Sequence, residues 1–268
     1  MKVIVVSKKD IASMNMKKIF LEKYPFEKTG EKYRGEKIYS YKDFLLITID
    51  TDSIYADFLE KDFKNSEIII FASRHSSKEK IKSLTVHTDG NFCKATFGGK
   101  DFKISYSNAI YNSTALLRLL KFKEEYNLDY KVSFEVTHHG PSIDLKTIWI
   151  EVGGSENEWK DMKACEAVVD TIISLEKLER FNEIGIGIGG NHYAPKFTKY
   201  VIENKVAIGH IIPRYVFNCI PDQMFIEAIK RTVPEINRIY IDKKGLKKAE
   251  KERVMNVLSF KKDIIVKI

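Results

Sequence analysis

The 268-residue sequence predicts an α/β fold in which a mixed, largely parallel sheet is flanked by helices. Short, largely apolar runs of strand length recur along the whole chain, and stretches with helical periodicity separate many of them. Strands that alternate with helices of roughly 10–20 residues form βαβ units, whose strands lie parallel. Because the connections are short, we expect a single α/β catalytic unit over residues 1–268, with a basic C-terminal segment at about 240–268.

The elements are predicted in order from these runs. The expected strands are Val3–Val6, Phe44–Ile49, Ile68–Ala72, Leu84–His87, Val132–Thr137, Thr147–Val152, Ile184–Ile188, Val206–Ile212 and Ile236–Ile241. The expected helices are Asp10–Tyr24, Asn108–Tyr126, Asp161–Arg180, Pro195–Glu203, Asp222–Arg231 and Gly245–Leu258. Two strands, Val132–Thr137 and Thr147–Val152, follow one another without a helix between them, which predicts an antiparallel insertion.

Composition excludes several classes of protein. Hydrophobic residues make up 44% and charged residues 31% of the chain, which excludes disordered and fibrous proteins. No apolar run approaches the ~20 residues of a membrane span, and the apolar N-terminal run is too short for a signal peptide, so we expect a cytoplasmic protein without a membrane partner. Cys93, Cys165 and Cys219 are far apart and lack CxxC spacing, so we expect neither a disulfide framework nor a cysteine zinc site.

The net charge is +8, and the excess is uneven. Residues 240–268 contain nine lysines and arginines against four acidic residues. A basic segment of this kind is a plausible contact surface for phosphates of a nucleic acid, with Lys247 and Lys248 as candidate RNA-binding residues. The alternative is a solvated helix face that carries both signs of charge.

All six histidines stand at or just past the end of an expected strand. In open α/β sheets the ligand crevice lies outside the carboxyl ends of the strands, so these side chains can converge although they are distant in sequence. Histidine and carboxylate side chains are the ligands of hydrolytic zinc sites. The candidate zinc ligands are His75, His87, His138, His139 and His192.

The segment FEVTHHGP is the most specific of the histidine motifs. Side chains alternate faces along a strand, so Glu135 and His139 should share one face and His138 should point to the other. We take Glu135 as the preferred general base and His138 and His139 as parts of the catalytic centre, while the next strand brings Glu151. The alternative is that the two histidines are hydrogen-bonded turn residues.

Two further motifs contribute candidate substrate contacts. In ASRHSS, the guanidinium of Arg74 and the hydroxyls of Ser73, Ser76 and Ser77 suit an anion, although an ordinary helix N-cap is the alternative. In LTVHTDGN, Asp89 is either a structural turn residue before Gly90, or His87 and Asp89 supply a ligand or form an orienting pair.

The segment GIGIGGNHYAPK formally matches GxGxxG, but its glycines alternate with isoleucine inside a strand and do not open a helix. A dinucleotide site is therefore not expected. Gly189 and Gly190 allow a ligand or another part of the backbone to come close, and Asn191 and Lys196 flank that opening as candidate substrate contacts. The aromatic residues Tyr193, Phe197 and Tyr215 either belong to the core or stack on bases.

Taken together, ASRHSS, LTVHTDGN, EVTHHGP, IGIGGNHYAPKFT and IGHIIPRY, in this order, resemble the archaeal and plant-type D-aminoacyl-tRNA deacylase family. The resemblance covers roughly residues 1–215. It implies zinc-dependent hydrolysis of the ester between a D-amino acid and the terminal ribose of tRNA. It also implies an α/β fold similar to peptidyl-tRNA hydrolases and phosphorylase-like proteins. The family motifs do not say which histidines bind metal.

The expected mechanism combines both lines of reasoning. Zinc is held by some of the five candidate histidines and polarises a water or the ester carbonyl, Glu135 acts as general base, and Arg74 and Lys196 hold the terminal phosphates. The partner is a tRNA that carries a D-amino acid, and we expect a monomer without an obligatory protein partner. Two alternatives stay open: another hydrolase, such as a peptidyl-tRNA hydrolase or zinc peptidase, and a non-catalytic RNA- or nucleotide-binding protein.

Overall fold

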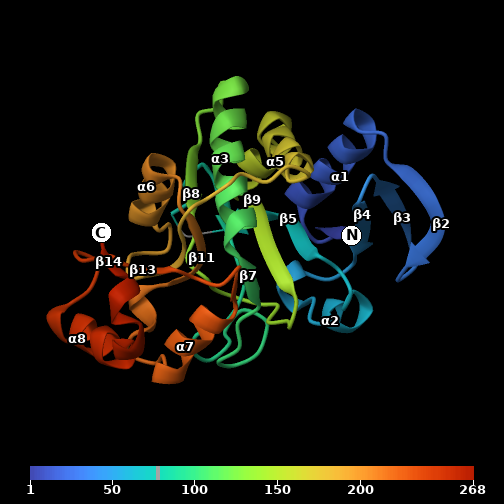
Figure 1. Cartoon of the computed structure of the whole chain (residues 1–268). Helices are drawn as coiled ribbons and strands as arrows, with labels where there is room; N and C mark the ends of the chain where they lie inside the picture. Colours follow the sequence, from blue (N-terminus) through green and yellow to red (C-terminus); the bar gives the residue numbers. More distant parts are fainter. Residues whose placement is uncertain (77–78) are drawn as a thin grey trace.

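The computed structural model describes residues 1–76 and 79–268, and within these residues fourteen strands form two sheets (Figure 1). Ser77 of the ASRHSS motif lies outside the described residues. The large sheet contains β1 (Lys2–Ser7), β2 (Glu27–Tyr33), β3 (Glu36–Tyr41), β4 (Phe44–Ile49), β5 (Ile68–Ser76), β6 (Ser83–His87), β7 (Tyr106–Asn108), β8 (Lys131–Phe134), β9 (Lys146–Gly154) and β12 (Thr232–Val233). The second sheet contains β10 (Ile184–Ile188), β11 (Ala207–Ile212), β13 (Arg238–Ile241) and β14 (Ile265–Lys267).

The strand directions confirm a mixed, largely parallel fold. β12, β7, β9, β5, β1 and β4 run parallel in that order across the large sheet, and all strand pairs of the second sheet are parallel. β2 and β3 continue the large sheet as an antiparallel hairpin beside β4. We did not predict this hairpin, because β2 reads EKTGEKY and is exposed along almost its whole length. Charged residues of this kind protect an edge strand from pairing with other chains.

The predicted antiparallel insertion exists with different neighbours. β8 and β9 do not pair with each other, because β6 lies between them and pairs parallel with β8 and antiparallel with β9. β8 also ends at Phe134, before the predicted end of the strand. From Glu135 onward the backbone N–H groups donate to other elements: to the carbonyl of Val86 in β6, of His192, and of Ile211 in β11. This stretch therefore connects the large sheet to the second sheet.

All six predicted helices are confirmed, with shifted ends. They are α1 (Ile11–Lys23), α3 (Ala109–Glu125), α5 (Met162–Ser174), α6 (Pro195–Asn204), α7 (Asp222–Lys230) and α8 (Lys248–Val257), and shorter helical segments are α2 (Leu59–Asp62), α4 (Glu156–Trp159), η1 (Ser53–Tyr55), η2 (Arg214–Val216) and η3 (Ser259–Ile264). The side chains of Asp10 and Asn108 accept hydrogen bonds from the first turns of α1 and α3, so N-capping sets where these helices begin. Among the described residues, no helix combines the length and apolar character needed to cross a membrane.

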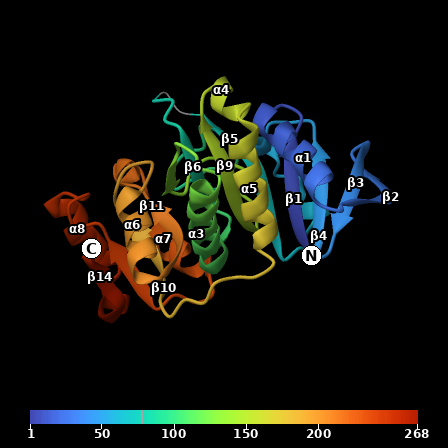
Figure 2. The same ribbon diagram turned by 90° about the horizontal axis from the view of Figure 1, so that it is seen from above.

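Helices α1, α5, α3 and α6 form one layer over the sheets (Figure 2). Helix α3 contacts β6 and β8 of the large sheet and β11 of the second sheet. Alternation along β1 sends Ile4 and Val6 into the core beneath α1, and Val3 and Val5 into the core on the opposite face. The sheet is thus covered on both faces, which leaves its strand ends to carry polar side chains.

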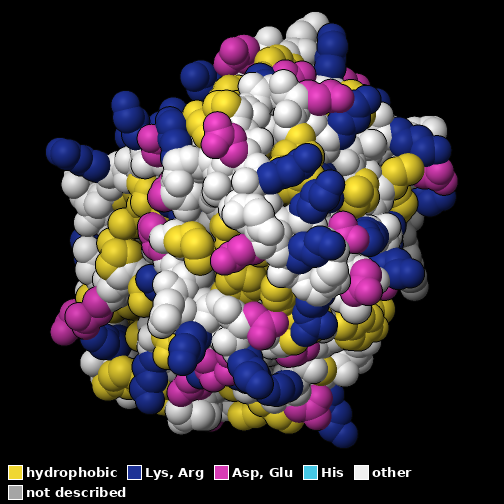
Figure 3. All heavy atoms as spheres, turned by 90° about the vertical axis from the view of Figure 1, so that its right-hand side faces the viewer, with side chains coloured by type: hydrophobic (Ala, Val, Ile, Leu, Met, Phe, Trp, Pro, Cys, Tyr) yellow, Lys and Arg dark blue, Asp and Glu magenta, His cyan; other side chains and the backbone are white. Residues whose placement is uncertain are grey.

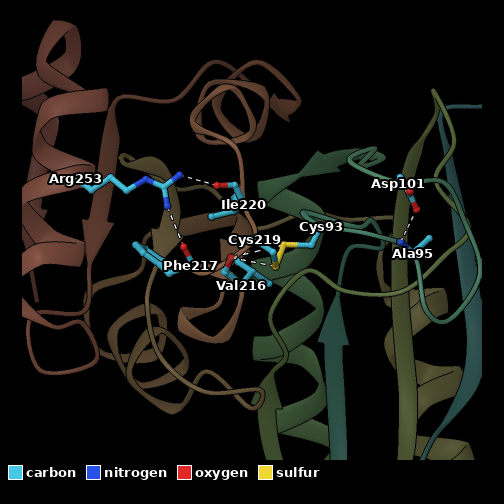
Figure 4. The surroundings of a disulfide bond; sticks show 8 residues. All are labelled: Cys93, Ala95, Asp101, Val216, Phe217, Cys219, Ile220 and Arg253. Atoms are coloured by element: carbon cyan, nitrogen blue, oxygen red, sulfur yellow. Dashed lines mark hydrogen bonds between the residues drawn. A yellow bond between two sulfur atoms is a disulfide. The ribbon is translucent and has the colours of Figure 1, made fainter.

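The part of the cysteine prediction that concerns disulfides is wrong, because Cys93 and Cys219 form a disulfide across 126 residues of sequence (Figure 4). Sequence spacing could not show this pair, since it joins the loop between β6 and β7 to the loop after η2. Arg253 of α8 donates to the carbonyls of Phe217 and Ile220, which holds the loop that contains Cys219. Cys165 is free and buried in α5.

Candidate active site and metal centre

Five of the six histidines and two glutamates meet in one cluster, and they come from five segments of the fold. His75 is near the end of β5, His87 ends β6, and Glu151 lies within β9 between these two strands. Glu135, His138 and His139 come from the segment after β8, and His192 comes from the loop after β10. The members of this His/Glu cluster are His75, His87, Glu135, His138, His139, Glu151 and His192.

Glu135 is at the centre of the cluster and is almost completely buried. One carboxylate oxygen lies 3.0 Å from Nδ1 of His75, and the other lies 2.9 Å from Nε2 of His192. The second oxygen is also 3.4 Å from Nε2 of His138. The prediction that His138 points away from Glu135 is therefore wrong. Strand geometry ends at Phe134, and His139 adopts a left-handed backbone conformation with φ of 46°, so the alternation of faces does not continue.

The pKa values of the two buried glutamates are shifted in opposite directions. Burial opposes the charged form of Glu135, but the charge of His75 and the contacts of His192 outweigh it and hold the pKa of Glu135 well below its usual value. Burial raises the pKa of Glu151 well above its usual value, and the negative charge of Glu135 adds to this. The Glu151 carboxyl lies 3.2 Å from Nε2 of His87. Without metal, the pKa values of the two carboxyl groups are thus shifted in opposite directions, an arrangement typical of acid–base sites.

Burial of His138 and His139 favours the neutral form of each ring, which is the form that binds a metal ion. Burial lowers the pKa of both, that of His139 to about 3. Nδ1 of His138 lies 2.8 Å from the carbonyl oxygen of Val136, and Nδ1 of His139 lies 2.6 Å from that of Gly140. Each Nδ1–H therefore donates to the backbone, which leaves the lone pair of Nε2 free toward the cluster.

The cluster fits a zinc ion. Three combinations of side chains place all their ligand atoms within 4.8 Å of one another: His87, His138 and His139; His75, Glu135 and His192; and His87, Glu135 and Glu151. Among the described residues, both oxygens of Glu135 and Nε2 of His192 are buried but make no hydrogen bond of good geometry. Buried polar atoms without such partners suit an ion that would bind them. Nitrogen and oxygen donors at this spacing match the ligand preference of zinc.

The cluster lies at the wall of an open cavity of about 510 Å³. Arg74, Asp52, Tyr55 and Phe97 line the outer part of this cavity together with His138 and His139. A space of this size is within the usual range for small-molecule sites. The cavity can therefore admit part of a substrate to Glu151 and to the four histidines that line it, whereas Glu135 and His87 are buried and are not part of its lining.

Comparison with known proteins identifies the family. The model of the D-aminoacyl-tRNA deacylase family matches residues 62–264. The chain belongs to this family. A relative in Pyrococcus furiosus, named D-aminoacyl-tRNA deacylase, is 40% identical over 254 residues, which cover 91% of this chain and 92% of the relative. A relative of the same name in Thermococcus onnurineus is 39% identical, with 92% of each chain covered. A crystal structure of a conserved protein of unknown function superposes with a TM-score of 0.89 and 31% identity, and covers 100% of this chain and 94% of that chain.

In this member of the deacylase family, Arg74 and Ser73 of the ASRHSS motif differ in how far their side chains are exposed. The Arg74 guanidinium lies 5.1 Å from the ring of Trp159 and donates to the carbonyl of Lys9, and its side chain is one-third exposed at the cavity. The Ser73 hydroxyl donates to the carboxylate of Asp10 over 3.0 Å and is buried. The Arg74 guanidinium also lies 3.9 Å from the carboxylate of Asp52, so it is a partly exposed cation at the cavity with one acidic neighbour, whereas the Ser73 hydroxyl is occupied by Asp10.

The predicted opening beside Gly189 and Gly190 is filled by the chain itself. A Cβ on Gly189 would lie 3.1 Å from the side chain of Leu246 and 3.2 Å from that of Asp242, so the glycine makes room for two side chains of the same chain, which is neither of the two alternatives considered. Nζ of Lys196 is 3.0 Å from the Asp242 carboxylate and donates to the carbonyl of Ile268. Gly190, Asn191 and Lys196 line a separate pocket of about 110 Å³, so the structure does not bring them into the cavity of the His/Glu cluster.

The C-terminal lysines form a basic groove of about 470 Å³ beside α8. The lysines that line it are Lys243, Lys248, Lys251 and Lys267. Lys247 precedes α8, and its backbone N–H donates to Glu250. On the face of the molecule near β2 and β3, in contrast, lysines and arginines are interspersed with acidic side chains (Figure 3). The basic groove is therefore the best candidate for contacts with the RNA backbone.

Several residues have roles that the sequence did not indicate. His210 lies inside β11, outside the cluster, and contacts Thr137 and the carbonyl of Ser105. Asp89 is neither a ligand nor a partner of the His87 ring nitrogens, because its carboxylate accepts from Nε1 of Trp149 at 2.8 Å. Of the aromatic residues near the glycines, Phe197 is core, Tyr215 is exposed, and the Tyr193 hydroxyl lies 3.1 Å from Nε2 of His75.

Proposed function

We propose that this protein is a zinc-dependent D-aminoacyl-tRNA deacylase, which hydrolyses the ester between a D-amino acid and the 3′-terminal ribose of tRNA and releases both products. The observation that carries the proposal is the His/Glu cluster at the wall of an open cavity, in a member of a family whose relatives have this name.

The three histidines His87, His138 and His139 are the best zinc ligands. Their nitrogens lie within 4.8 Å of one another, and burial favours the neutral form of each ring, the form that binds metal. Three histidines are also a ligand set that leaves a coordination position open. When bound there, zinc would act as a Lewis acid toward the ester.

This choice leaves Glu135 as the general base. Its carboxylate is ionised, lies 3.4 Å from Nε2 of His138, and is held by His75 and His192 on its other sides. Glu135 takes a proton from the water that attacks the ester carbonyl carbon. The same carboxyl then returns the proton to the ribose oxygen as the ester bond breaks, so the proton count balances. His75 and His192 orient the carboxylate during both transfers.

Binding of the tRNA is assigned to two regions. Arg74 at the cavity contacts a phosphate near the 3′ end, and the basic groove beside α8 contacts the RNA backbone further away. Selection of D over L amino acids is a steric and hydrogen-bonding difference at the α-carbon, and the transition states of the two esters should differ in stabilisation by on the order of a few kcal/mol.

The decisive test compares D-Tyr-tRNA and L-Tyr-tRNA as substrates, with zinc-loaded and chelator-treated protein. We expect hydrolysis of the D ester alone, loss of activity with the metal, and recovery on addition of zinc. His139→Ala should lower zinc content and activity by roughly 10–100-fold or more. Lys18→Ala is the control, because this exposed lysine of α1 lies outside the cluster and its replacement should change neither.

Other outcomes would contradict the proposal. Equal hydrolysis of the D and L esters, or preference for N-acetylated aminoacyl-tRNA or for peptides, would assign the site to a different hydrolase. Binding of tRNA without turnover of any ester would indicate a non-catalytic RNA-binding protein. Full activity in metal-free protein would refute the role of zinc.

A further inference from the structure

Two large aromatic side chains stand exposed at the mouth of the catalytic cavity. Phe97 is 67% exposed and Tyr55 is 55% exposed, and both line the cavity that contains His138 and His139. An exposed phenylalanine forgoes the stabilisation that burial of its ring would provide. Two such rings at one cavity mouth indicate a binding surface for a flat, apolar group.

The loop between β6 and β7, which carries Phe97, is fixed against its surroundings. Gly98 has a φ of 69°, and a Cβ there would lie 2.0 Å from the carbonyl oxygen of Ile54, the residue before Tyr55. This close approach places the backbone of Phe97 beside that of Tyr55. The Phe97 carbonyl also accepts a hydrogen bond of 2.8 Å from the N–H of Gly140, the residue after His139. The backbone beside Phe97 is thus attached to both the second aromatic residue and the catalytic segment.

Other attachments hold the rest of this loop. The disulfide between Cys93 and Cys219 anchors one arm, and the Asp101 carboxylate accepts from the N–H of Ala95 across the loop (Figure 4). The ring of Phe97 is therefore presented to solvent by a rigid loop. A binding group that is held in place before the ligand arrives loses less entropy on binding.

We propose that Phe97 and Tyr55 form a stacking site for the terminal adenine base of the substrate. This inference rests on the proposed function, because it takes the ester on the terminal ribose as the reacting group. The adenine is attached to that same ribose, so it must lie within one sugar of the His/Glu cluster, on the leaving-group side of the ester. Nucleobases present a flat π face, and aromatic rings bind them by stacking.

The amino-acid side chain is the competing occupant. Its α-carbon is bonded directly to the ester carbonyl, so the side chain stays close to the cluster, where Trp149 and Ile54 line the cavity. The rings of Phe97 and Tyr55 are the more exposed part of the lining, which suits a group that enters last and remains partly in water. The adenine is also the part of the substrate that every tRNA shares.

The experiment compares two esters of D-tyrosine, the ester with adenosine and the ethyl ester, which has no base. For Phe97→Ala we expect KM for the adenosine ester and for D-Tyr-tRNA to rise by roughly 5–100-fold, with kcat little changed. KM for the ethyl ester should change less than about twofold, and Phe97→Trp should retain wild-type KM because it keeps an aromatic face. Phe102→Ala is the matched control: Phe102 is on the same loop and 41% exposed, but it does not line this cavity.

The outcomes separate this inference from the proposed function. If the wild type cleaves these esters and Phe97→Ala raises KM equally for both, the ring contacts the amino acid and the inference is wrong. Unchanged KM for all substrates would also overturn it. If the wild type cleaves none of them, the proposed function fails, and binding of the non-hydrolysable amide of D-tyrosine with 3′-amino-3′-deoxyadenosine then tests the stacking site directly. Weaker amide binding in Phe97→Ala supports the stacking site, and equal or absent binding overturns it.

Discussion

Replacing Glu135 by glutamine removes one negative charge from the centre of the His/Glu cluster while keeping the size of the side chain. In the wild type this carboxylate lies within 3.0 Å of His75 and within 2.9 Å of His192. An amide has almost no basicity, so it cannot take the proton of the attacking water. We expect kcat for D-Tyr-tRNA to fall by roughly 10²–10⁴-fold, the usual contribution of a positioned acid–base group.

The same change has a thermodynamic signature in the chelated protein. Burial disfavours the charged form of His75, but Glu135 overcomes this and raises the pKa of His75 above its usual value of about 6.5. A raised pKa contributes stability that is fully present below the unfolded value and is lost as the pH rises through the folded value. The free energy of unfolding lost in Glu135→Gln should therefore be larger at pH 6 than at pH 9. Breaking a buried ion pair costs about 3–5 kcal/mol, which sets the upper limit of this loss.

Glu151→Gln is the control for Glu135→Gln. Because the pKa of Glu151 is raised and that of Glu135 is lowered, an amide at position 151 changes the charge of the cluster less than an amide at position 135. We expect this variant to keep more activity and stability than Glu135→Gln. The measurements are single-turnover hydrolysis, bound zinc and unfolding at both pH values. Wild-type kcat in Glu135→Gln would refute the role of base, and loss of zinc from this variant would make Glu135 a ligand.

Three other predictions test the remaining regions. Lys248→Glu with Lys251→Glu should raise KM for tRNA at nearly constant kcat and flatten the dependence of binding on log salt concentration; an unchanged slope would place the RNA surface elsewhere. Burial lowers the pKa of His210 to about 3, so this histidine should reduce the free energy of unfolding by about 1.4 kcal/mol per pH unit below pH 6.5. Denaturant unfolding of chelated His210→Gln should therefore show a shallower loss of stability between pH 7 and pH 5 than the wild type. Cys93→Ser should lower the melting temperature by roughly 5–15 °C, and a reductant should destabilise the wild type but not this variant.

The sequence indicated correctly that the histidines converge, but the property of parallel sheets explains only part of this convergence. His75 lies near the carboxyl end of β5, which is parallel to β9, whereas His87 ends β6, which runs antiparallel to β9, so the two rings approach Glu151 from opposite directions along the sheet. Glu151 belongs to the cluster although it lies within β9 and not at its end, because β5 and β6 flank β9 and each places a histidine near it. That placement requires the order of the strands, which no local pattern contains.

Contacts between distant segments could not be predicted for the same reason. The Cys93–Cys219 disulfide joins two loops that have no recognisable local pattern, and the hairpin of β2 and β3 is too polar to show an apolar run. The glycines after β10 correctly indicated a close approach, but only the structure shows that Asp242 and Leu246 of the same chain fill the space. A glycine indicates that another group packs close to the backbone at that position, but which residues do so depends on the rest of the fold.

The segment after Phe134 shows how such distant contacts decide the chemistry. Alternation of faces assumes that a strand keeps one neighbour, but the N–H groups of Glu135, Val136 and Thr137 donate to β6, to His192 and to β11 in turn. Regular strand pairing ends at Phe134 and His139 has a φ of 46°, so the alternation of faces stops, and Glu135 and His138, three residues apart, come to face each other. If the strand had continued with its alternation intact, His138 would have pointed away from the carboxylate. The proximity of base and ligand in this site is therefore a product of the junction between the two sheets, and substitutions that disturb this junction should affect catalysis before they affect folding.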